Sequence, residues 1–218
     1  MVASKKCITR LSKYKNALYR LKAFGFVKVF SDNVADAVGV TATQVRKDFS
    51  LFRISGSRKG GYLIDDLILK LNEILGKNEI QKIVIVGMGN IGTALLNYAG
   101  FEKEGIKIIA GFDTNPKRYK EKKGIPVYPL EHLETFVSNN KIKIGIISVP
   151  YIAAQTVLDQ MISAGIKGVL NFAPIRLRGN DDCTITNVNL VLELENLIYH
   201  VKMNALEKNE VKTKTGKN

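Results

Sequence analysis

The residues best suited to hold a ligand form a glycine-rich turn, Gly87-Met88-Gly89-Asn90-Ile91-Gly92. The apolar run Ile83 to Val86 precedes it and predicts a short, buried parallel strand. After the turn, apolar residues recur at helical spacing (Ile91, Leu95, Leu96 and Ala99). A strand, a glycine turn and a helix in this order are the context of a dinucleotide-binding fingerprint.

Each glycine of this turn has its own predicted role. Gly87 allows the tight turn, Gly89 lets the backbone approach a pyrophosphate, and Gly92 lets helix and strand pack closely. The start of the helix adds unpaired N–H groups and the positive end of the helix dipole. The alternative is a glycine turn that binds nothing, and the flanking elements argue against it.

Asp113 is the second candidate for ligand binding. Residues 107–112 predict a strand, and Asp113 stands at its end, 26 residues after Gly87, close to the usual spacing of a ribose-binding acid. Its carboxylate would accept hydrogen bonds from ribose hydroxyls and repel a 2′-phosphate, which favours NAD(H) over NADP(H). The neighbouring Lys117 and Arg118 weaken that preference, and capping of the Thr-Asn-Pro turn is an alternative role for Asp113.

The elements that position these residues alternate between strand and helix. Strands are predicted at 125–127, 142–149 and 169–171, and helices at 130–139 and 152–164. The alternation predicts a Rossmann-type, doubly wound parallel sheet over residues 78–188. Val149 and Pro150 close one strand at the carboxyl edge, where open α/β sheets bind ligands.

Residues 1–77 predict a winged helix-turn-helix domain. An amphipathic helix over 8–21 is followed by two short helices separated by Gly39, the second capped by Thr41. One side of that second helix is apolar (Ala42, Val45 and Phe49). Its other side carries the hydrogen-bonding side chains that a major-groove helix requires, namely Thr43, Gln44, Arg46, Lys47 and Ser50. A surface helix with a solvated polar face would have the same spacing.

The basic, glycine-rich segment 54–62 favours DNA binding over that alternative. It predicts a two-stranded wing whose Arg58 and Lys59 reach the DNA backbone or the minor groove. A helical stripe over 64–75 follows, ending at Gly76. The chain has a net charge of +13, most of it in this N-terminal third, as expected for a domain that binds a polyanion.

The C-terminal part and the composition complete the outline. Residues 189–206 predict one helix with an apolar stripe that needs a partner, either its own domain or a second subunit, and 207–218 predict a disordered tail. The two cysteines form neither a disulfide framework nor a metal-ligand spacing. Without a membrane-length apolar run or a secretory signal, the sequence predicts a cytoplasmic protein with no membrane partner and no metal.

Two other classes of function compete with DNA binding. A dehydrogenase needs a proton donor or acceptor at the hydride site, yet neither His132 nor His200 follows a carboxyl-edge strand. Tyr119 and Lys123 have the spacing of a catalytic pair, but they lie in a lysine-rich turn on the adenosine side. A domain that binds CoA is the third interpretation, and Asp113 favours a ribose diol instead.

Taken together, several motifs resemble the redox-sensing transcriptional repressor family Rex. They are TATQVRKDFS, RKGGY, GMGNIGTALLNY, AGFDTNP, SVP, AGIKGVLNFAP and LELENLIY. The resemblance extends from about Ile8 to Val201. It implies a homodimer with a swapped C-terminal helix that binds palindromic operator DNA, senses the NADH/NAD+ ratio and is released from DNA by NADH.

The resemblance also implies roles for individual residues. Gln44, Arg46 and Lys47 would face the major groove and Arg58 the minor groove. Residues 87–92 and Asp113 would hold the adenosine diphosphate part of NAD(H), with Tyr98, Val149 and Pro150 near the nicotinamide.

Several positions depart from the family pattern. Arg53 and Ser55 stand where Phe-Gly elements usually precede the wing, and Lys59 follows Arg58 where the wing usually has glycine. Asn189 replaces an aspartate of a proposed switch, and Asn16 replaces the arginine with which that aspartate pairs in one state, Tyr98 being its partner in the other. A neutral pair is weaker than a charge-assisted one, so we expect reduced coupling between NADH and DNA release.

Overall fold

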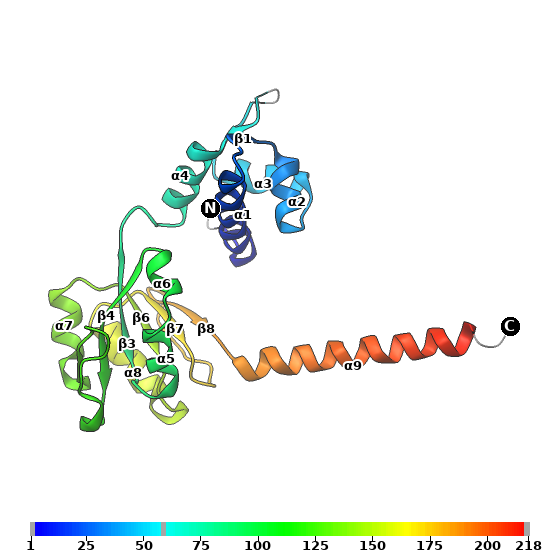
Figure 1. Ribbon diagram of the computed structural model, residues 1–218. Helices are drawn as coiled ribbons and strands as arrows, with labels where there is room; N and C mark the ends of the chain where they lie inside the picture. Colours follow the sequence, from blue (N-terminus) through cyan, green and yellow to red (C-terminus); the bar gives the residue numbers. More distant parts are fainter. Residues whose placement is uncertain (1–2, 58–59, 216–218) are drawn as a thin grey trace. The chain divides into compact units, whose positions relative to one another are not determined.

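The computed structural model describes residues 3–57 and 60–215, so Arg58 and Lys59 lie outside the described residues. The chain divides into two compact units, Met1–Ile80 and Gln81–Asn218 (Figure 1). The sequence predicted this boundary after residue 77.

The first unit contains the elements of a winged helix-turn-helix. In chain order they are α1 (Lys5–Ala23), β1 (Lys28–Val29), α2 (Ser31–Val38), α3 (Ala42–Leu51), β2 (Tyr62–Leu63) and α4 (Ile64–Ile74). The apolar sides of its helices meet in one core, to which Leu11 and Leu18 of α1, Val45 and Phe49 of α3, and Leu67 and Leu71 of α4 contribute. The amphipathic spacing predicted from the sequence is therefore the packing pattern of this unit.

The turn between α2 and α3 forms as the sequence predicted. Gly39 has φ +72°, a left-handed conformation that favours glycine at the end of a helix. The hydroxyl of Thr41 accepts a hydrogen bond from the Gln44 backbone N–H at 3.1 Å and so caps α3. α2 begins differently, because Ser31 is already helical and buried. There the side chain of Asn33 accepts a hydrogen bond from the Phe30 backbone N–H at 2.8 Å.

The strands of the wing pair differently from the predicted local hairpin. β2 pairs antiparallel with β1, which precedes α2, through Lys28 opposite Leu63 and Val29 opposite Tyr62. Near the tip, a bridge between Ser57 and Gly61 joins the two sides of segment 54–62. A pairing between segments so far apart in the chain leaves no local signal in the sequence.

The second unit is built on six parallel strands in the order β5-β4-β3-β6-β7-β8. The strands are β3 (Gln81–Val86), β4 (Ile106–Asp113), β5 (Val127–Pro129), β6 (Ile144–Ile147), β7 (Gly168–Asn171) and β8 (Thr184–Asn187). After β3 the chain adds β4 and β5 on one side and then β6, β7 and β8 on the other. The strand order therefore reverses between β3 and β6, the point where open α/β sheets bind ligands.

Helices cover both faces of this sheet, as a doubly wound fold requires. They are α5 (Asn90–Leu96), α6 (Gly100–Lys103), η1 (Pro116–Arg118), η2 (Leu130–His132), α7 (Leu133–Asn139) and α8 (Tyr151–Ser163). Val84 and Val86 of β3 pack in the core that contains α7 and α8. Ile83 and Ile85 alternate with them and pack in the core that contains Leu96 of α5.

Two elements of this unit differ from the sequence prediction. The fingerprint helix α5 ends at Leu96, before Asn97 and Gly100, so Ala99 lies outside it and Ile91 is exposed rather than on an apolar face. The sequence did not predict β8, because three of its four residues are polar and it lies at the edge of the sheet.

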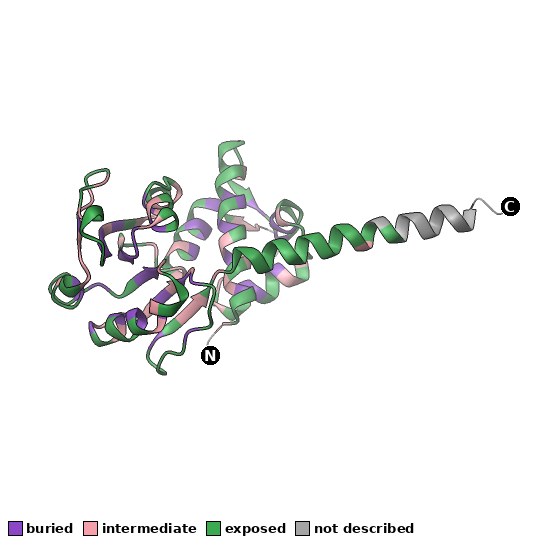
Figure 2. Cartoon of the chain, turned by 90° about the horizontal axis from the view of Figure 1, so that it is seen from below, coloured by how far each residue is buried: buried purple, intermediate pink, exposed green. Residues whose placement is uncertain are grey.

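The C-terminal helix α9 (Leu190–Thr215) is longer than predicted. It continues past Leu206 into residues predicted to be a disordered tail, because glutamate and lysine favour helix and no glycine or proline occurs before Gly216. From Leu190 to Val201 its apolar side chains are exposed, with Ile198 at 66% and Val201 at 62% (Figure 2). None of the helices in the described part of the chain has the length and apolar character to cross a bilayer.

A buried carboxylate ties α1 to α3, and sequence reasoning missed it. Asp48 accepts hydrogen bonds from Arg10 Nε (2.6 Å) and Nη2 (2.7 Å), Tyr14 Oη (2.8 Å), Gln44 Nε2 (2.9 Å) and Cys7 Sγ (3.4 Å). Burial alone would raise the pKa of Asp48, but these hydrogen bonds outweigh it and lower that pKa below its ordinary value. The position of Asp48 between Val45 and Phe49, on the core side of α3, is the signal that the sequence offered.

We predict that Asp48→Asn destabilises the first unit by about 2 kcal/mol. Loss of one partner of a buried ion pair costs about 3–5 kcal/mol, and a lower value is expected here because Arg10 remains 24% exposed. Because the folded-state pKa is lowered, the stabilisation is complete at neutral pH and is lost as the pH falls from about 3.9 through the folded-state value.

Chemical denaturation of the wild type, Asp48→Asn and the control Asp36→Asn at several pH values measures this effect. Asp36 is exposed on α2, so its substitution removes the same charge without breaking the network. Equal stability of the two variants at neutral pH would contradict the assigned role of Asp48.

Candidate functional site

A cavity of about 540 Å³ opens at the carboxyl ends of β3, β4 and β6. This volume is in the range of small-molecule sites. The cavity is lined by seven predicted ligand-binding residues: Gly87, Gly89, Asn90, Ile91, Asp113, Val149 and Pro150. The structure therefore brings the fingerprint, the acid and the Val-Pro edge to one place, although they are distant in the chain.

Two of the three fingerprint glycines are required by close packing. Gly87 has φ +94°, and a Cβ there would lie 2.5 Å from the carbonyl oxygen of Ser148. A Cβ on Gly92 would lie 2.0 Å from the carbonyl oxygen of Gly87. These are the tight turn and the close helix–strand packing predicted from the sequence.

Gly89 is different, because the protein itself leaves room beside it. The nearest atom to a Cβ at Gly89 would be Nη1 of Arg118, at 3.9 Å. The backbone of Gly89 has φ −70°, which any residue can adopt. Neither packing nor conformation requires glycine here, and the open space on the cavity side is available to a ligand.

Ser148 fixes the turn from the neighbouring strand. Its hydroxyl donates to the carbonyl oxygen of Gly87 at 2.8 Å and lies 3.3 Å from that of Val86. The sequence predicted a role for Val149 and Pro150 of the Ser-Val-Pro motif, but it did not predict that Ser148 belongs to the ligand site. The signal was its position directly after the buried strand β6.

Asp113 lies at the end of β4 and is 5% exposed. Its Oδ2 accepts hydrogen bonds from the Met88 backbone N–H at 2.7 Å and from Arg118 Nη1 at 3.0 Å. Its Oδ1 accepts one from the Asn115 backbone N–H at 2.8 Å, so the predicted turn-capping role is present. Burial would raise the pKa of Asp113, but these hydrogen bonds hold it below its ordinary value, so the group is a carboxylate at neutral pH.

Three predicted ligand-binding residues do not line this cavity. Met88 is buried and serves through its backbone N–H, and Gly92 is buried in the helix–strand contact. The ring of Tyr98 is 60% exposed and packs edge-on against Phe101 at 5.2 Å. It lines a separate cavity of about 200 Å³.

The ionisable side chains of the cavity determine which chemistry it could perform. Asp113 and Arg118 are the ionisable residues among those described as lining it, and they pair with each other. His132, His200, Tyr119 and Lys123 do not line it. The arrangement can bind and orient a ligand, which is the chemistry that it supports.

The predicted DNA-reading residues lie on the exposed side of α3. Thr43, Arg46, Lys47 and Ser50 are exposed, and Arg46 donates to the Thr43 hydroxyl at 3.2 Å. Gln44 is half-buried and donates through Nε2 to the buried Asp48. The helix thus has the apolar side and the polar side that the sequence predicted. One of its polar side chains, Gln44, is held by a hydrogen bond to the buried Asp48.

The two asparagines of the proposed switch lie in different units. Asn16 is exposed on α1. The side-chain oxygen of Asn189 accepts hydrogen bonds from the backbone N–H groups of Val191 and Leu192, each at 3.1 Å. Asn189 therefore caps the start of α9, a role that the sequence analysis did not assign.

Parts of the chain match two family models. Residues 78–175 match the model described as "CoA binding domain", and residues 3–50 match the one described as "Putative DNA-binding protein N-terminus". The two matches cover parts of both units.

Curated relatives match nearly the whole chain. The redox-sensing transcriptional repressor Rex of Pelotomaculum thermopropionicum is 42% identical over 195 residues, covering 89% of this chain and 92% of the relative. The protein of the same name from Desulforamulus reducens is 42% identical over 197 residues, covering 90% and 94%.

Solved structures agree with these relatives. The crystal structure of RSP in complex with beta-NAD+ and operator DNA is similar with a TM-score of 0.89 and 35% identity, covering 96% of this chain and 97% of RSP. RSP in complex with beta-NADH gives a TM-score of 0.84 and 34% identity, covering 96% and 98%. RSP is described as a Rex-family repressor. On this evidence the chain belongs to the Rex family of redox-sensing transcriptional repressors.

Proposed function

We propose that this protein is a DNA-binding repressor whose affinity for operator DNA is set by the cellular NADH/NAD+ ratio, with NADH causing release. One observation carries the proposal: the same chain contains two sites. The first is helix α3, which exposes several hydrogen-bond donors, and the second is a cavity at the reversal of strand order that contains a dinucleotide fingerprint. The complexes of RSP with beta-NAD+, operator DNA and beta-NADH support the same assignment.

The residues of the cavity fit the common part of NAD+ and NADH. The open space beside Gly89 allows the backbone to approach a pyrophosphate. Asp113 is a carboxylate that is able to accept hydrogen bonds from ribose hydroxyls. Since Arg118 already occupies Oδ2 of Asp113, the side chain of Arg118 has to move before that oxygen can accept a ribose hydroxyl. Asp113 favours NAD(H) over NADP(H), and its pairing with Arg118 moderates that preference.

Discrimination between NADH and NAD+ must lie at the nicotinamide end. Val149 and Pro150 form that wall of the cavity, and we assign Tyr98 to the same end. Tyr98 has to leave its present position against Phe101 to take part. The exposure of its ring is compatible with such a movement.

For DNA recognition, we propose that Thr43, Gln44, Arg46, Lys47 and Ser50 face the major groove. Arg58 and Lys59 are proposed to contact the backbone or the minor groove of a palindromic operator. Asp48 accepts a hydrogen bond from one N–H of the Gln44 amide, so the second N–H and the carbonyl oxygen of that amide are left for DNA.

The working unit is proposed to be a homodimer. The apolar side chains of α9 from Leu190 to Val201 are exposed, and a second copy offers the same apolar surface in return (Figure 2). Exchange of α9 between subunits would bury this surface. A two-fold dimer also matches a palindromic operator, because each half-site receives one helix α3.

We further propose that the protein is a regulator without catalytic activity and acts in the cytoplasm, where the chromosomal operators lie. The pairing of Asp113 with Arg118 supports this, since it leaves no free acid or base among the described lining residues. A CoA-binding function is the competing proposal, favoured by the family model that matches residues 78–175.

NADH can lower the affinity for DNA only because it binds the DNA-incompetent arrangement of the dimer more tightly than the competent one. The ratio of those two NADH affinities limits how far the DNA affinity falls. Asn16 and Asn189 replace the two charged residues of the proposed switch with neutral ones. The side chain of Asn189 instead caps α9 by accepting hydrogen bonds from two N–H groups of that helix, and it carries no charge. We therefore propose that the response to NADH is weaker than in family members with the charged pair.

The first prediction tests the function itself. The wild-type chain should bind a duplex selected from a randomised pool, and NADH should weaken that binding by about fivefold or more, the lower range of allosteric coupling. Fluorescence anisotropy of the labelled duplex measures this at fixed salt, with NAD+, NADPH and CoA as matched ligands. Oxidation of NADH by a substrate panel without DNA binding would favour an enzyme, and release by CoA alone would favour the CoA proposal.

The second prediction separates ligand binding from folding within the fingerprint. Gly89→Ala should fold normally, because its Cβ enters open space, but should weaken NADH binding by about tenfold or more. Gly92→Ala should instead destabilise the second unit by about 1–3 kcal/mol, because its Cβ meets the Gly87 carbonyl.

Calorimetric titration with NADH and thermal unfolding distinguish the two variants. Unchanged NADH affinity in a folded Gly89→Ala protein would exclude this turn from the pyrophosphate site.

The third prediction concerns the switch. The double variant Asn16→Arg with Asn189→Asp should show a larger NADH-dependent loss of DNA affinity than the wild type, by about threefold or more, because a charge-assisted pair replaces a neutral one. Either single variant should gain less. Asp also caps helices well, so the start of α9 should survive the change. A wild-type response as large as that of the double variant would show that charge is unimportant here.

A further inference from the structure

The end of the recognition helix α3 contains an arginine in a backbone conformation that suits glycine. Arg53 has φ +55°. The Ile54 N–H donates to the Phe49 carbonyl at 2.9 Å, and the Arg53 N–H donates to the Ser50 carbonyl at 3.0 Å. These two bonds form a Schellman motif, in which the left-handed position is usually glycine because a Cβ is disfavoured there.

Packing does not explain why an arginine occupies this position. Arg53 is exposed, and its guanidinium makes no hydrogen bond or ion pair with the described residues. Its apolar neighbour Ile54, by contrast, packs against the core of the unit. The fold would keep the same turn with glycine. Because Lys123 and Lys141 of the second unit also have positive φ, the conformation by itself identifies no partner, and only the surroundings of Arg53 indicate one.

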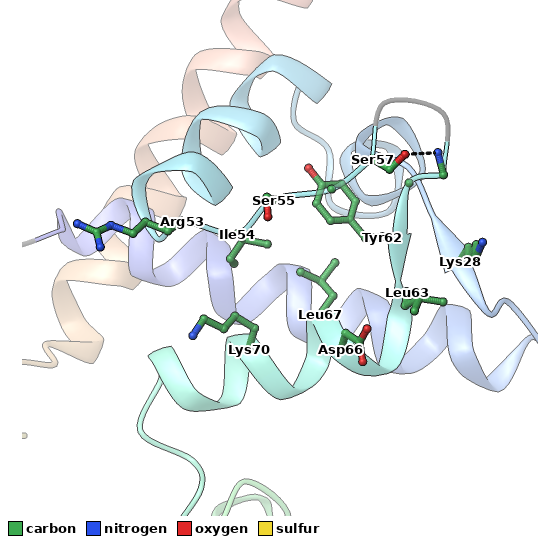
Figure 3. Close-up of a pocket in the computed structure, with 13 residues that line it drawn as sticks. Lys28, Arg53, Ile54, Ser55, Ser57, Tyr62, Leu63, Asp66, Leu67 and Lys70 are labelled. Carbon is green, nitrogen blue, oxygen red and sulfur yellow. Dashed lines mark hydrogen bonds between the residues drawn. The ribbon is translucent and has the colours of Figure 1, made fainter.

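The surroundings of Arg53 favour an anionic partner. Arg53 lines a pocket of about 590 Å³ beside the wing, together with Lys28, Lys70 and Asp66 (Figure 3). Figure 3 shows Arg53 and Lys70 extending on the same side of this pocket, with Lys28 on the other. Lys70 is partly neutralised by Glu73, whose Oε2 lies 2.6 Å from Lys70 Nζ. Of the three cations that line this pocket, Arg53 and Lys28 are exposed and have no partner among the described residues.

We propose that Arg53 contacts a phosphate of the DNA backbone next to the site read by α3, and so extends the DNA interface of this chain beyond the recognition helix and the wing tip. Arg53 follows the last residue of α3 by two positions and lies three residues after Ser50 of its exposed side. Guanidinium groups bind phosphate oxygens with two parallel hydrogen bonds, which explains an arginine at this exposed turn. The proposal rests on the DNA-binding function proposed above.

The substitution Arg53→Gly tests this, because its effects on stability and on DNA binding should run in opposite directions. The melting temperature should stay unchanged or rise by up to about 5 °C, since glycine suits the left-handed position. DNA affinity should fall by about three- to tenfold, and the slope of log affinity against log salt should decrease by about one. Arg53→Asn should weaken binding equally, because asparagine also tolerates this conformation but has no positive charge.

The full-length chain and one selected duplex serve for all measurements. Lys13→Gln is the control, since it removes one exposed positive charge from α1 of the same unit and should leave the slope unchanged. An unchanged slope and affinity in Arg53→Gly would overturn the proposal, as would a lower melting temperature, or an equal loss in Lys13→Gln. A wild type that selects no duplex would instead remove the DNA-binding function itself.

Discussion

The contact between the ends of β3 and β6 is the constraint on which the second unit depends. Gly87 approaches Ser148 so closely that a Cβ would overlap its carbonyl oxygen, and the Ser148 hydroxyl donates back to the Gly87 carbonyl. This contact occurs where the strand order reverses. It therefore joins the ends of β3 and β6 and also shapes the mouth of the cavity. The same backbone atoms cannot be moved to tune ligand affinity without loosening the sheet.

The site therefore separates structural residues from ligand-binding ones. Gly87, Gly92 and Ser148 are fixed by packing, whereas Gly89 and Arg118 border open space. Asp113 belongs to both groups, because its carboxylate secures the Met88 N–H of the turn and also faces the cavity. An acid that is already bonded is pre-oriented, and burial makes the hydrogen bonds that hold it stronger than they would be in water.

The first unit follows a similar logic with a buried charge. Asp48 links Arg10 and Tyr14 of α1 to Gln44 on the polar side of α3. The helix proposed to read DNA is thus held to α1 by hydrogen bonds as well as by apolar packing. A movement of α1 would therefore disturb the hydrogen bonds that orient Gln44 on α3.

The sequence by itself determined the elements whose signals are local. Periodicity, glycine at a left-handed turn and the Thr41 cap predicted the helix-turn-helix, and the strand–turn–helix context predicted the fingerprint. It also identified Asp113 and the Val149-Pro150 edge, because parallel strands present their carboxyl ends at one edge of a sheet.

Only the tertiary structure decided the features that depend on residues distant in the chain. These are the pairing of β2 with β1, the added strand β8, and the network that joins Asp48 to Arg10 and Tyr14. In each case the partners are brought together by folding, and no spacing along the chain encodes their contact. The left-handed conformation of Arg53 was decided by the structure for another reason: its hydrogen bonds to the end of α3 are local, but its residue type predicts the opposite conformation.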